Sequence, residues 1–318
     1  MSNEARGPRG SAELPAVVAV VGPTASGKSA LALDLAERLG GEVVNTDAMQ
    51  VYRGMDIGTA KLPVDQRRGI PHHLLDVLHV TQSASVAQFQ SMARTAVEDA
   101  RARGVTPVLV GGSALYTRAV LDDLKFPGTD PALRADLETE AEQVGPAVMH
   151  DRLRAVDPVA AEQISPANVR RVVRALEVVT LTGRPFQASL PPPSYVFEHT
   201  VQVGLGIDRP VLDQRIALRV EQMWQAGLVD EVRRLVDVGL REGRTASRAL
   251  GYQQVIACLD GACSEQEALD ATVVGTRRFA RRQDSWFGRD DRITWVRWDD
   301  PDRVDRALEA GSALRSGR

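Results

Sequence analysis

Eight consecutive residues with the spacing of a phosphate-binding loop carry the clearest chemical signal in the sequence. They read GPTASGKS and follow the apolar run 16–21. In the pattern GxxxxGK[ST], between a strand and a helix, the backbone N–H groups close around phosphate oxygens at the positive end of the helix. Lys28 would add a positive charge, and the Ser29 hydroxyl could ligate Mg²⁺. We therefore expect a phosphate chain to bind Gly22, Pro23, Thr24, Ala25, Ser26, Gly27, Lys28 and Ser29.

A carboxylate, Asp47, ends the next predicted strand, 42–47. Because ligands of α/β sheets bind at the carboxyl ends of the strands, its position favours a chemical role. It could be a general base, a Mg²⁺ ligand or a helix cap. The third predicted strand ends in VGGS, without the acidic residue that an NTPase normally has at a strand end. Small-molecule kinases of this fold also carry an acid at the Asp47 position, so the loop alone does not identify a nucleotide.

The elements that would position these groups alternate between strands and helices. Apolar runs predict strands at 16–21, 42–47 and 107–112, and periodic apolar residues predict helices over 28–39 and 86–103, with another helix from Ser113. Continuous apolar strands separated by helices indicate a parallel sheet that is covered on both faces.

From about Phe126 the pattern changes to short helices opened by Asp-Pro, Ser-Pro or Gly-Pro. The Pro-rich segment 190–194 ends them, and strands return at 199–207 and 292–298. We predict an α/β fold: a P-loop core with a mostly parallel sheet flanked by helices, plus a helical insertion domain. The predicted boundaries are 1–14 for a flexible tail, 15–125 and 196–318 for the core with its C-terminal helices, and 126–195 for the insertion domain.

Composition and charge limit the kind of protein. Of 318 residues, 43% are hydrophobic and 25% are charged, which is ordinary for a soluble globular protein. No apolar stretch is long enough for a membrane span or a secretory signal, so we expect a cytoplasmic protein without a membrane, and by default a monomer. Cys258 and Cys263 have no second pair, which favours two idle thiols over a zinc site or a disulfide framework. The net charge of −3 argues against a protein that coats nucleic acid.

Arginines nevertheless gather in two places, the segment 170–174 and the segment 276–289. Residues four apart lie on one helix face. The predicted rows are Arg170 with Arg174, Arg277 with Arg281, and Arg278 with Arg282. Such rows are usually solvated, but they also suit contacts with RNA phosphates. The aromatic residues Phe279, Trp286 and Phe287 could stack on bases, although aromatic residues more often fill a core.

Two further polar segments allow more than one interpretation. Asp56, Thr59 and Lys61, in the glycine-containing segment GMDIGTAK, could belong to the site or to the surface. His72 and His73 are adjacent in an extended segment, so their side chains point to opposite sides. We expect a structural hydrogen bond from one of them rather than a shared metal site.

Seven segments occur in an order that resembles the bacterial tRNA dimethylallyltransferase family. They are GPTASGKS, DAMQVYRGMDIGTAK, PHHLLD, VLVGGSALY, RALEV, RALGYQQ and RRFARRQDSWF. The match covers nearly the whole chain beyond the tail. MDIGTAK together with RRQxxWF is specific to that family rather than to P-loop proteins in general.

The resemblance implies a donor, an acceptor and a metal. Dimethylallyl diphosphate would place its leaving diphosphate in the loop with Lys28, and with Mg²⁺ on Ser29. The acceptor would be N6 of adenosine 37 in tRNA, with Asp47 as the base. Ala48 stands where the family commonly has serine, and Ser113 where it has threonine, which affects fine positioning. The implied tRNA contacts are Asp47, Ala48, Met49, Gln50, Ser113, Arg170, Arg171, Arg174, Arg248, Gly251, Tyr252, Gln253, Arg277, Arg281, Arg282 and Gln283.

Two other function classes compete with this interpretation. A small-molecule kinase would use ATP in the same loop, but the sequence has no obvious lid with paired arginines, and a kinase gives no reason for the basic C-terminal helix. A non-catalytic RNA-binding protein would leave the set of Lys28, Ser29 and Asp47 unexplained.

Overall fold

The computed structural model describes residues 14–316, with side chains described through residue 310. The predicted tail, 1–14, lies outside the described residues except for Leu14. The described residues form two compact units, one of residues 123–194 and one of residues 14–122 with 195–316. The sequence predicts the smaller unit over 126–195, so the observed unit starts three residues earlier and ends one residue earlier.

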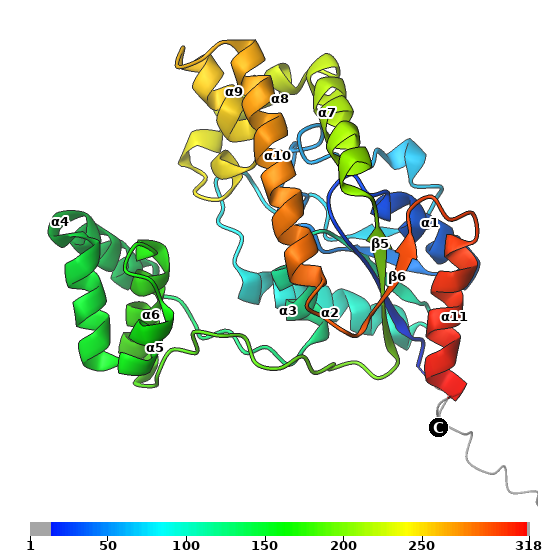
Figure 1. Ribbon diagram of the computed structural model, residues 1–318, viewed down its shortest axis with the longest axis horizontal. Helices are drawn as coiled ribbons and strands as arrows, with labels where there is room; N and C mark the ends of the chain where they lie inside the picture. The colour runs from blue at the N-terminus through cyan, green and yellow to red at the C-terminus, as the bar shows by residue number, and fades with distance from the viewer. Residues whose placement is uncertain (1–13, 317–318) are drawn as a thin grey trace, which may run out of the picture. The chain divides into compact units, whose positions relative to one another are not determined.

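The larger unit is built on a six-stranded sheet in which all neighbouring strands are parallel (Figure 1). The spatial order is β3-β2-β4-β1-β5-β6. The strands are β1 (Val17–Val21), β2 (Glu42–Asn45), β3 (His72–His73), β4 (Pro107–Val110), β5 (Thr200–Gly206) and β6 (Ile293–Arg297). The predicted α/β fold with a parallel sheet is confirmed, and β3 is a short strand in the segment that the sequence predicts to be extended.

Different helices cover the two faces of the sheet because alternate residues of β1 point to opposite sides. Val18 and Val20 pack with α1 (Lys28–Leu39) and α11 (Arg303–Ser316). Val17 and Ala19 pack with α2 (Val86–Ala102) and α3 (Ala114–Leu121). This two-sided burial explains why the strand sequences are continuously apolar.

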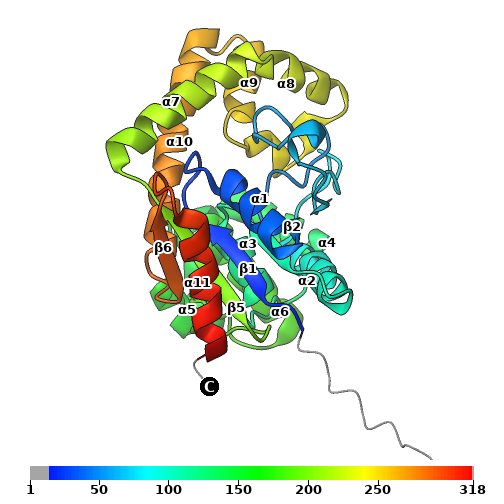
Figure 2. The ribbon, with the colours of Figure 1, turned by 90° about the vertical axis from the view of Figure 1, so that its right-hand side faces the viewer.

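Four further helices form a group of their own beyond one end of the sheet (Figure 2). They are α7 (Arg209–Gln225), α8 (Leu228–Asp237), α9 (Tyr252–Leu259) and α10 (Glu265–Phe287). Two short 3₁₀ turns, η2 (Leu240–Glu242) and η3 (Ala246–Arg248), lie between α8 and α9. A third, η1 (Val64–Gln66), lies between β2 and β3. Helix α10 packs against both α7 and α9 and also reaches α3. It therefore joins the helix group to the core.

The smaller unit has its own helical core. It contains α4 (Pro131–Val156), α5 (Pro158–Gln163) and α6 (Val169–Thr182). Gly145 leaves helical geometry at φ 84° and Pro146 follows it, so α4 bends there, at the predicted junction between two helices. The core side chains include Leu137, Met149 and Leu176.

The predicted structural role for the histidines is confirmed, and it applies to both. His72 Nδ1 contacts the Ile70 carbonyl at 2.8 Å, and His73 Nε2 contacts Glu42 Oε2 at 2.8 Å. Cys258 and Cys263 are free and partly buried. No helix among the described residues has the length and apolar content that crossing a membrane requires.

Candidate active site

The phosphate loop connects β1 to α1 and is shaped by two glycines with positive φ. Gly22 has φ 135°, and a Cβ on it would lie 3.1 Å from the Leu205 carbonyl oxygen. Gly27 has φ 102° and caps α1, so both positions favour glycine. The Lys28 Nζ bends back over the loop and donates to the Pro23 carbonyl at 2.6 Å. This hydrogen bond joins the first residue of α1 to the start of the loop.

One buried polar atom in this loop lacks a partner. Ser26 is 1% exposed, and its Oγ makes no hydrogen bond within the described part of the chain. A buried hydroxyl without a partner is costly, so its presence in a phosphate loop fits a site that is completed by an anion. Ser29 is exposed at the first turn of α1.

Two arginines of α7 complete the positive side of the site. The Arg215 Nε donates to the Ala25 carbonyl at 2.8 Å, and its guanidinium stacks on the Trp298 ring with a separation of 4.6 Å. Arg219 lies one turn further along the helix, and burial lowers its pKa. These residues were missed by the sequence analysis. The only signal is their spacing of four, which a solvated helix face shows equally often.

The pKa of Lys28 reflects its burial and the neighbouring cation. Burial, together with the nearby charge of Arg219, lowers the pKa of Lys28 to about 7, while Asp47 and Asp284 act in the opposite direction. Asp47 also opposes the lowering of the Arg219 pKa. The charges of Lys28, Arg219 and Asp47 therefore interact with one another.

Asp47 is held by a network at the end of β2, which stops at Asn45 rather than at Asp47 as predicted. The Asn45 side chain accepts from the Asp47 N–H at 2.8 Å and donates to the Asp47 carbonyl at 3.1 Å. The Asp47 Oδ1 accepts from the Met49 N–H at 2.8 Å, so it caps a turn and not a helix. The Ala48 N–H donates to the Ser113 Oγ at 3.4 Å. No hydrogen bond of the described residues engages Asp47 Oδ2, which leaves this oxygen for a substrate.

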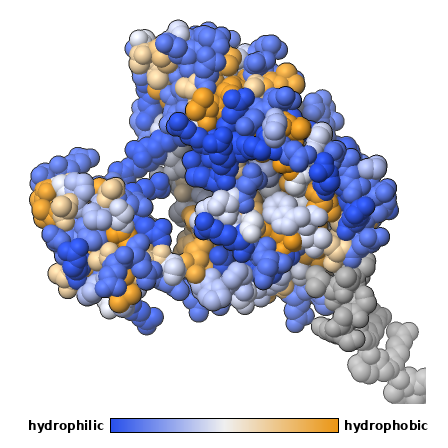
Figure 3. Space-filling view, in the orientation of Figure 1, coloured by the Kyte–Doolittle hydropathy of each residue, from blue (hydrophilic) through white to orange (hydrophobic). Residues whose placement is uncertain are grey.

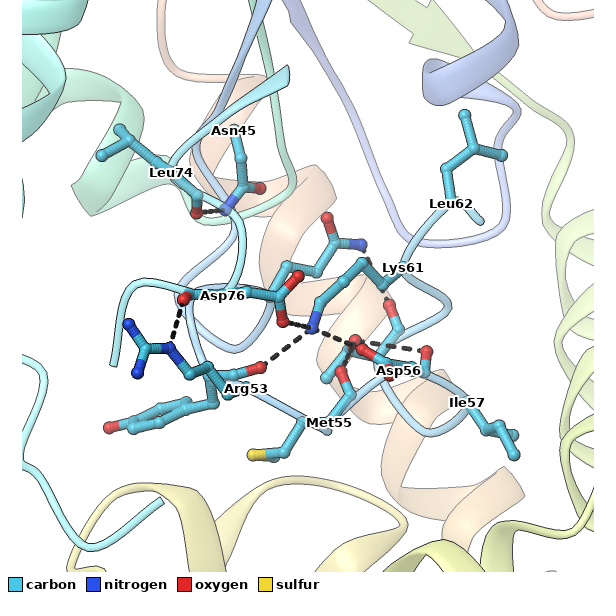
Figure 4. Close-up of polar contacts among 12 residues, drawn as sticks. Asn45, Arg53, Met55, Asp56, Ile57, Lys61, Leu62, Leu74 and Asp76 are labelled. Carbon is cyan, nitrogen blue, oxygen red and sulfur yellow. Dashed lines mark hydrogen bonds and ion pairs between the residues drawn. The ribbon is translucent and has the colours of Figure 1, made fainter. Parts of the chain in front are cut away.

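The loop that follows Asp47 is tied down by Lys61 (Figure 4). The Lys61 side chain is 3% exposed, and its Nζ pairs with Asp56 and Asp76, each at 2.6 Å. It also donates to the Tyr52 carbonyl at 2.9 Å. The sequence allowed Asp56 and Lys61 to belong either to the site or to the surface. Lys61 is buried, whereas Asp56, whose side chain is 56% exposed, pairs with it from the surface. The Gln50 Nε2 donates to the Thr59 carbonyl at 3.1 Å, which links the same loop to the segment after Asp47.

The other end of this loop is held by Glu231 of α8. This carboxylate is 3% exposed and accepts from the N–H groups of Asp56, Ile57 and Gly58 at 3.1, 2.8 and 3.2 Å. It also accepts from the Tyr252 hydroxyl at 2.6 Å. Tyr252 is fully buried, so its predicted contact with tRNA needs correction: its side chain contacts protein. The predicted tRNA contact of Gly251 also needs correction, because this residue is buried at the N-terminus of α9.

The same correction applies to Gln283 of α10. This residue is 4% exposed, and both atoms of its amide are bonded to protein, at the N–H of Thr24 and the carbonyl of Gly112. Its side chain is therefore assigned to the phosphate loop and not to RNA.

The exposed face of α10 is basic. Arg278, Arg281 and Arg282 are exposed, while Arg277 is partly buried and donates to the Asp213 carbonyl at 3.1 Å. Strongly hydrophilic side chains gather along this helix in Figure 3. Trp286 is 45% exposed and Phe287 is 4% exposed, so only Phe287 is a core residue. Arg248 and Gln253, near the start of α9, are also exposed.

The arginines of the smaller unit differ in their partners. Arg170 is exposed on α6. Arg171 donates to the Ala188 carbonyl, and Arg174 pairs with the buried carboxylate of Glu177 at 2.6 Å and donates to the Pro127 carbonyl at 2.7 Å. Arg174 thus holds its own unit together and has little freedom to contact RNA.

Comparison with known proteins identifies the family. A family model described as IPP transferase matches residues 50–290. The tRNA dimethylallyltransferase of Nocardioides sp. is 64% identical over 301 residues, which cover 95% of this chain and 97% of that protein. The Streptomyces coelicolor tRNA dimethylallyltransferase is 60% identical over 291 residues, covering 92% and 93%. The chain belongs to the IPP transferase family.

Solved structures of similar proteins agree with this assignment. The tRNA isopentenylpyrophosphate transferase of Bacillus halodurans is 40% identical, with a TM-score of 0.68 over 94% of this chain and 95% of that chain. A eukaryotic dimethylallyltransferase acting on tRNA is 25% identical, with a TM-score of 0.82 over 96% of this chain and 80% of that chain. The family predicted from the seven sequence segments is confirmed.

Proposed function

We propose that this IPP transferase moves a dimethylallyl group from dimethylallyl diphosphate to N6 of adenosine 37 in the anticodon loop of tRNA and releases diphosphate. The observation that carries the proposal is the phosphate loop, whose Lys28 donates to the Pro23 carbonyl and interacts electrostatically with Arg219 and with Asp47, the carboxylate that follows β2. The products are N6-(dimethylallyl)adenosine and diphosphate. The chain would act in the cytoplasm as a monomer.

The cations act on the leaving group. When the allylic C–O bond breaks, its electron pair goes to the diphosphate, whose added charge must be stabilised. The loop N–H groups, Lys28 and Arg219 supply positive potential there, in a partly buried setting that strengthens it. Arg215 supports the loop through the Ala25 carbonyl.

The residues also fit a magnesium ion. No three His, Cys, Asp or Glu side chains come together as a metal site within the described part of the chain. Mg²⁺ commonly takes few ligands from protein when phosphate oxygens supply the rest. The hydroxyl of Ser29, an exposed residue at the start of α1, would hold the ion together with the diphosphate. When bound, the ion neutralises charge on the departing diphosphate.

Asp47 acts on the acceptor. The lone pair of N6 is delocalised into the adenine ring, so the amine is a weak nucleophile. As N6 forms its bond to the allylic carbon, Asp47 takes a proton from N6, and general base catalysis lowers the barrier. The turn formed by Asp47, Ala48 and Met49 fixes Oδ1 and leaves Oδ2 for this proton.

The acceptor base must leave its stack to reach this carboxylate. An anticodon loop is single-stranded, which lowers the cost of extrusion. The exposed Arg278, Arg281 and Arg282, with Trp286 at 45% exposure, would contact phosphates and bases of the loop. Further contacts would come from Arg248, Gln253 and Arg170, and from Ala48, Met49, Gln50 and Ser113 beside the base.

One assay separates this function from its competitors. The protein is incubated with Mg²⁺, an anticodon stem-loop containing adenosine 37, and either labelled dimethylallyl diphosphate or γ-labelled ATP. Transfer of label to the RNA from the allylic donor alone is expected. Transfer of phosphate from ATP to a small molecule would replace the proposal with a kinase. RNA binding without either transfer would make the protein a non-catalytic RNA-binding protein.

The role of Asp47 is tested by Asp47→Ala. Loss of the base should lower kcat by roughly 10²- to 10⁴-fold, while the Kd for the stem-loop changes little. Single-turnover transfer and fluorescence anisotropy measure the two quantities. Near-normal turnover would remove Asp47 from the mechanism.

A further inference from the structure

The buried amide of Gln283 joins the basic helix α10 to the phosphate loop. Its Oε1 accepts from the Thr24 N–H at 2.8 Å, and its Nε2 donates to the Gly112 carbonyl at 2.8 Å. Thr24 belongs to the phosphate loop, and Gly112 lies in the turn between β4 and α3. One side chain therefore satisfies a donor and an acceptor from two segments far apart in sequence.

The bond to Thr24 reaches Lys28 through a single peptide plane. The N–H of Thr24 and the C=O of Pro23 belong to the same trans peptide, so they point in opposite directions. Gln283 holds the N–H on one side of that plane, and the Pro23 carbonyl on the other side accepts from the Lys28 Nζ at 2.6 Å. Any rotation of this peptide would move the carbonyl to which Lys28 is bonded.

The amide packs directly against Gly112. A methyl group on Gly112 would overlap Gln283 Nε2, and the Gly22 carbonyl oxygen is 3.5 Å from the place of that methyl. The start of the phosphate loop, the turn after β4 and the end of α10 thus meet at Gln283. Glycine at 112 is required because the amide occupies the space of its side chain.

We propose that Gln283 is a positioning residue that orients the phosphate loop and Lys28 for the donor diphosphate. The inference rests on the proposed function, since that function supplies the diphosphate. Gln283 differs in role from its exposed neighbours Arg281 and Arg282, which face solvent on the same helix.

The main test compares two ligands in Gln283→Ala. Full-length protein is titrated with inorganic pyrophosphate and Mg²⁺ by calorimetry, and with the anticodon stem-loop by fluorescence anisotropy. We expect the Kd for pyrophosphate to rise about tenfold, the effect of losing the hydrogen bond from the Thr24 N–H that orients the loop. The Kd for the stem-loop should stay within about twofold of wild type. The KM for dimethylallyl diphosphate should rise in parallel. Gln266→Ala, an exposed glutamine on the same helix, is the matched control and should leave both constants unchanged.

A second variant displaces the amide without removing it. Gly112→Ala should push Gln283 away and weaken pyrophosphate binding by a similar factor. In a Gln283→Ala background the added methyl no longer overlaps the amide and lies 3.5 Å from the Gly22 carbonyl oxygen, an ordinary contact. Gly112→Ala should then add less than about a twofold effect. Full additivity of the two substitutions would show that they act independently and would overturn the inference.

The remaining outcomes are equally decisive. An unchanged Kd for pyrophosphate in Gln283→Ala, or a loss confined to the stem-loop, would overturn the positioning role. If Gln283→Ala does not fold, Gly112→Ala alone decides, and an unchanged Kd for pyrophosphate in it contradicts the inference. Wild-type protein that binds no pyrophosphate would count against the proposed function instead.

Discussion

Lys28 combines two demands that conflict in the free protein. It must approach a phosphate loop closely, and burial beside Arg219 then penalises its charge. The pKa of Lys28 falls to about 7, although Asp47 and Asp284 act to raise it. An arriving diphosphate brings negative charge that favours the protonated amine. The Lys28 amine should therefore become more fully protonated when the diphosphate binds.

This arrangement predicts proton uptake on donor binding. The pKa of Lys28 is about 7 in the free protein and should be higher with an anion bound. The contribution of protonated Lys28 to pyrophosphate affinity is therefore fully present below pH 7 and is lost as the pH rises through the pKa of the bound state. At pH 8 the binding of pyrophosphate should take up close to one proton more in wild type than in Lys28→Met. Calorimetry in buffers of different ionisation enthalpy measures the difference, and the variant corrects for titration of pyrophosphate itself. Equal uptake in both proteins would show that Lys28 is already charged.

At the scale of elements, the loop over 51–61 owes its shape to residues far from it in sequence. Glu231 of α8 accepts its N–H groups, Tyr252 of α9 donates to Glu231, and Lys61 pairs with Asp56. Tyr252→Phe deletes one hydrogen bond to a buried carboxylate and keeps the ring, so the free energy of unfolding should fall by about 1–3 kcal/mol. Urea denaturation measures this, and the Kd for the stem-loop should stay within twofold. Unchanged stability with weaker RNA binding would restore the predicted RNA contact.

Local signals predicted the elements well and their long-range partners poorly. The helix over 28–39 could be predicted from its apolar periodicity and the glycines that follow it. The strand before Asp47 could be predicted from its apolar run, although it stops two residues earlier than expected, and the phosphate loop from its residue spacing. The RALGYQQ segment suggested an RNA contact for Tyr252, but no local pattern shows that Glu231 lies beneath it. Arg219 was missed for the same reason, because its burial depends on the packing of α7 against the loop.

For the whole molecule, the net charge of −3 coexists with a basic face on α10. Polyanion binding depends on where charges lie more than on their sum. Arg281 and Arg282 are exposed there. Arg38 and Arg297 are also exposed, but they pair with Asp305 and with Asp208 and Asp299. Replacing Arg281 and Arg282, or Arg38 and Arg297, by alanine changes the net charge equally, from −3 to −5. Comparing these two double variants therefore separates the effect of charge on α10 from the effect of total charge.

The double variant Arg281→Ala/Arg282→Ala should weaken binding of the stem-loop and flatten its dependence on salt. Each lost phosphate contact reduces the slope of log K against log salt by about 0.7–0.9, so two contacts reduce it by roughly 1.5. Arg38→Ala/Arg297→Ala should leave that slope unchanged. Anisotropy titrations across a range of salt concentrations measure both. Equal slopes in the two double variants would place the tRNA away from α10, whereas a selective change locates the RNA backbone on the helix whose Gln283 holds the phosphate loop.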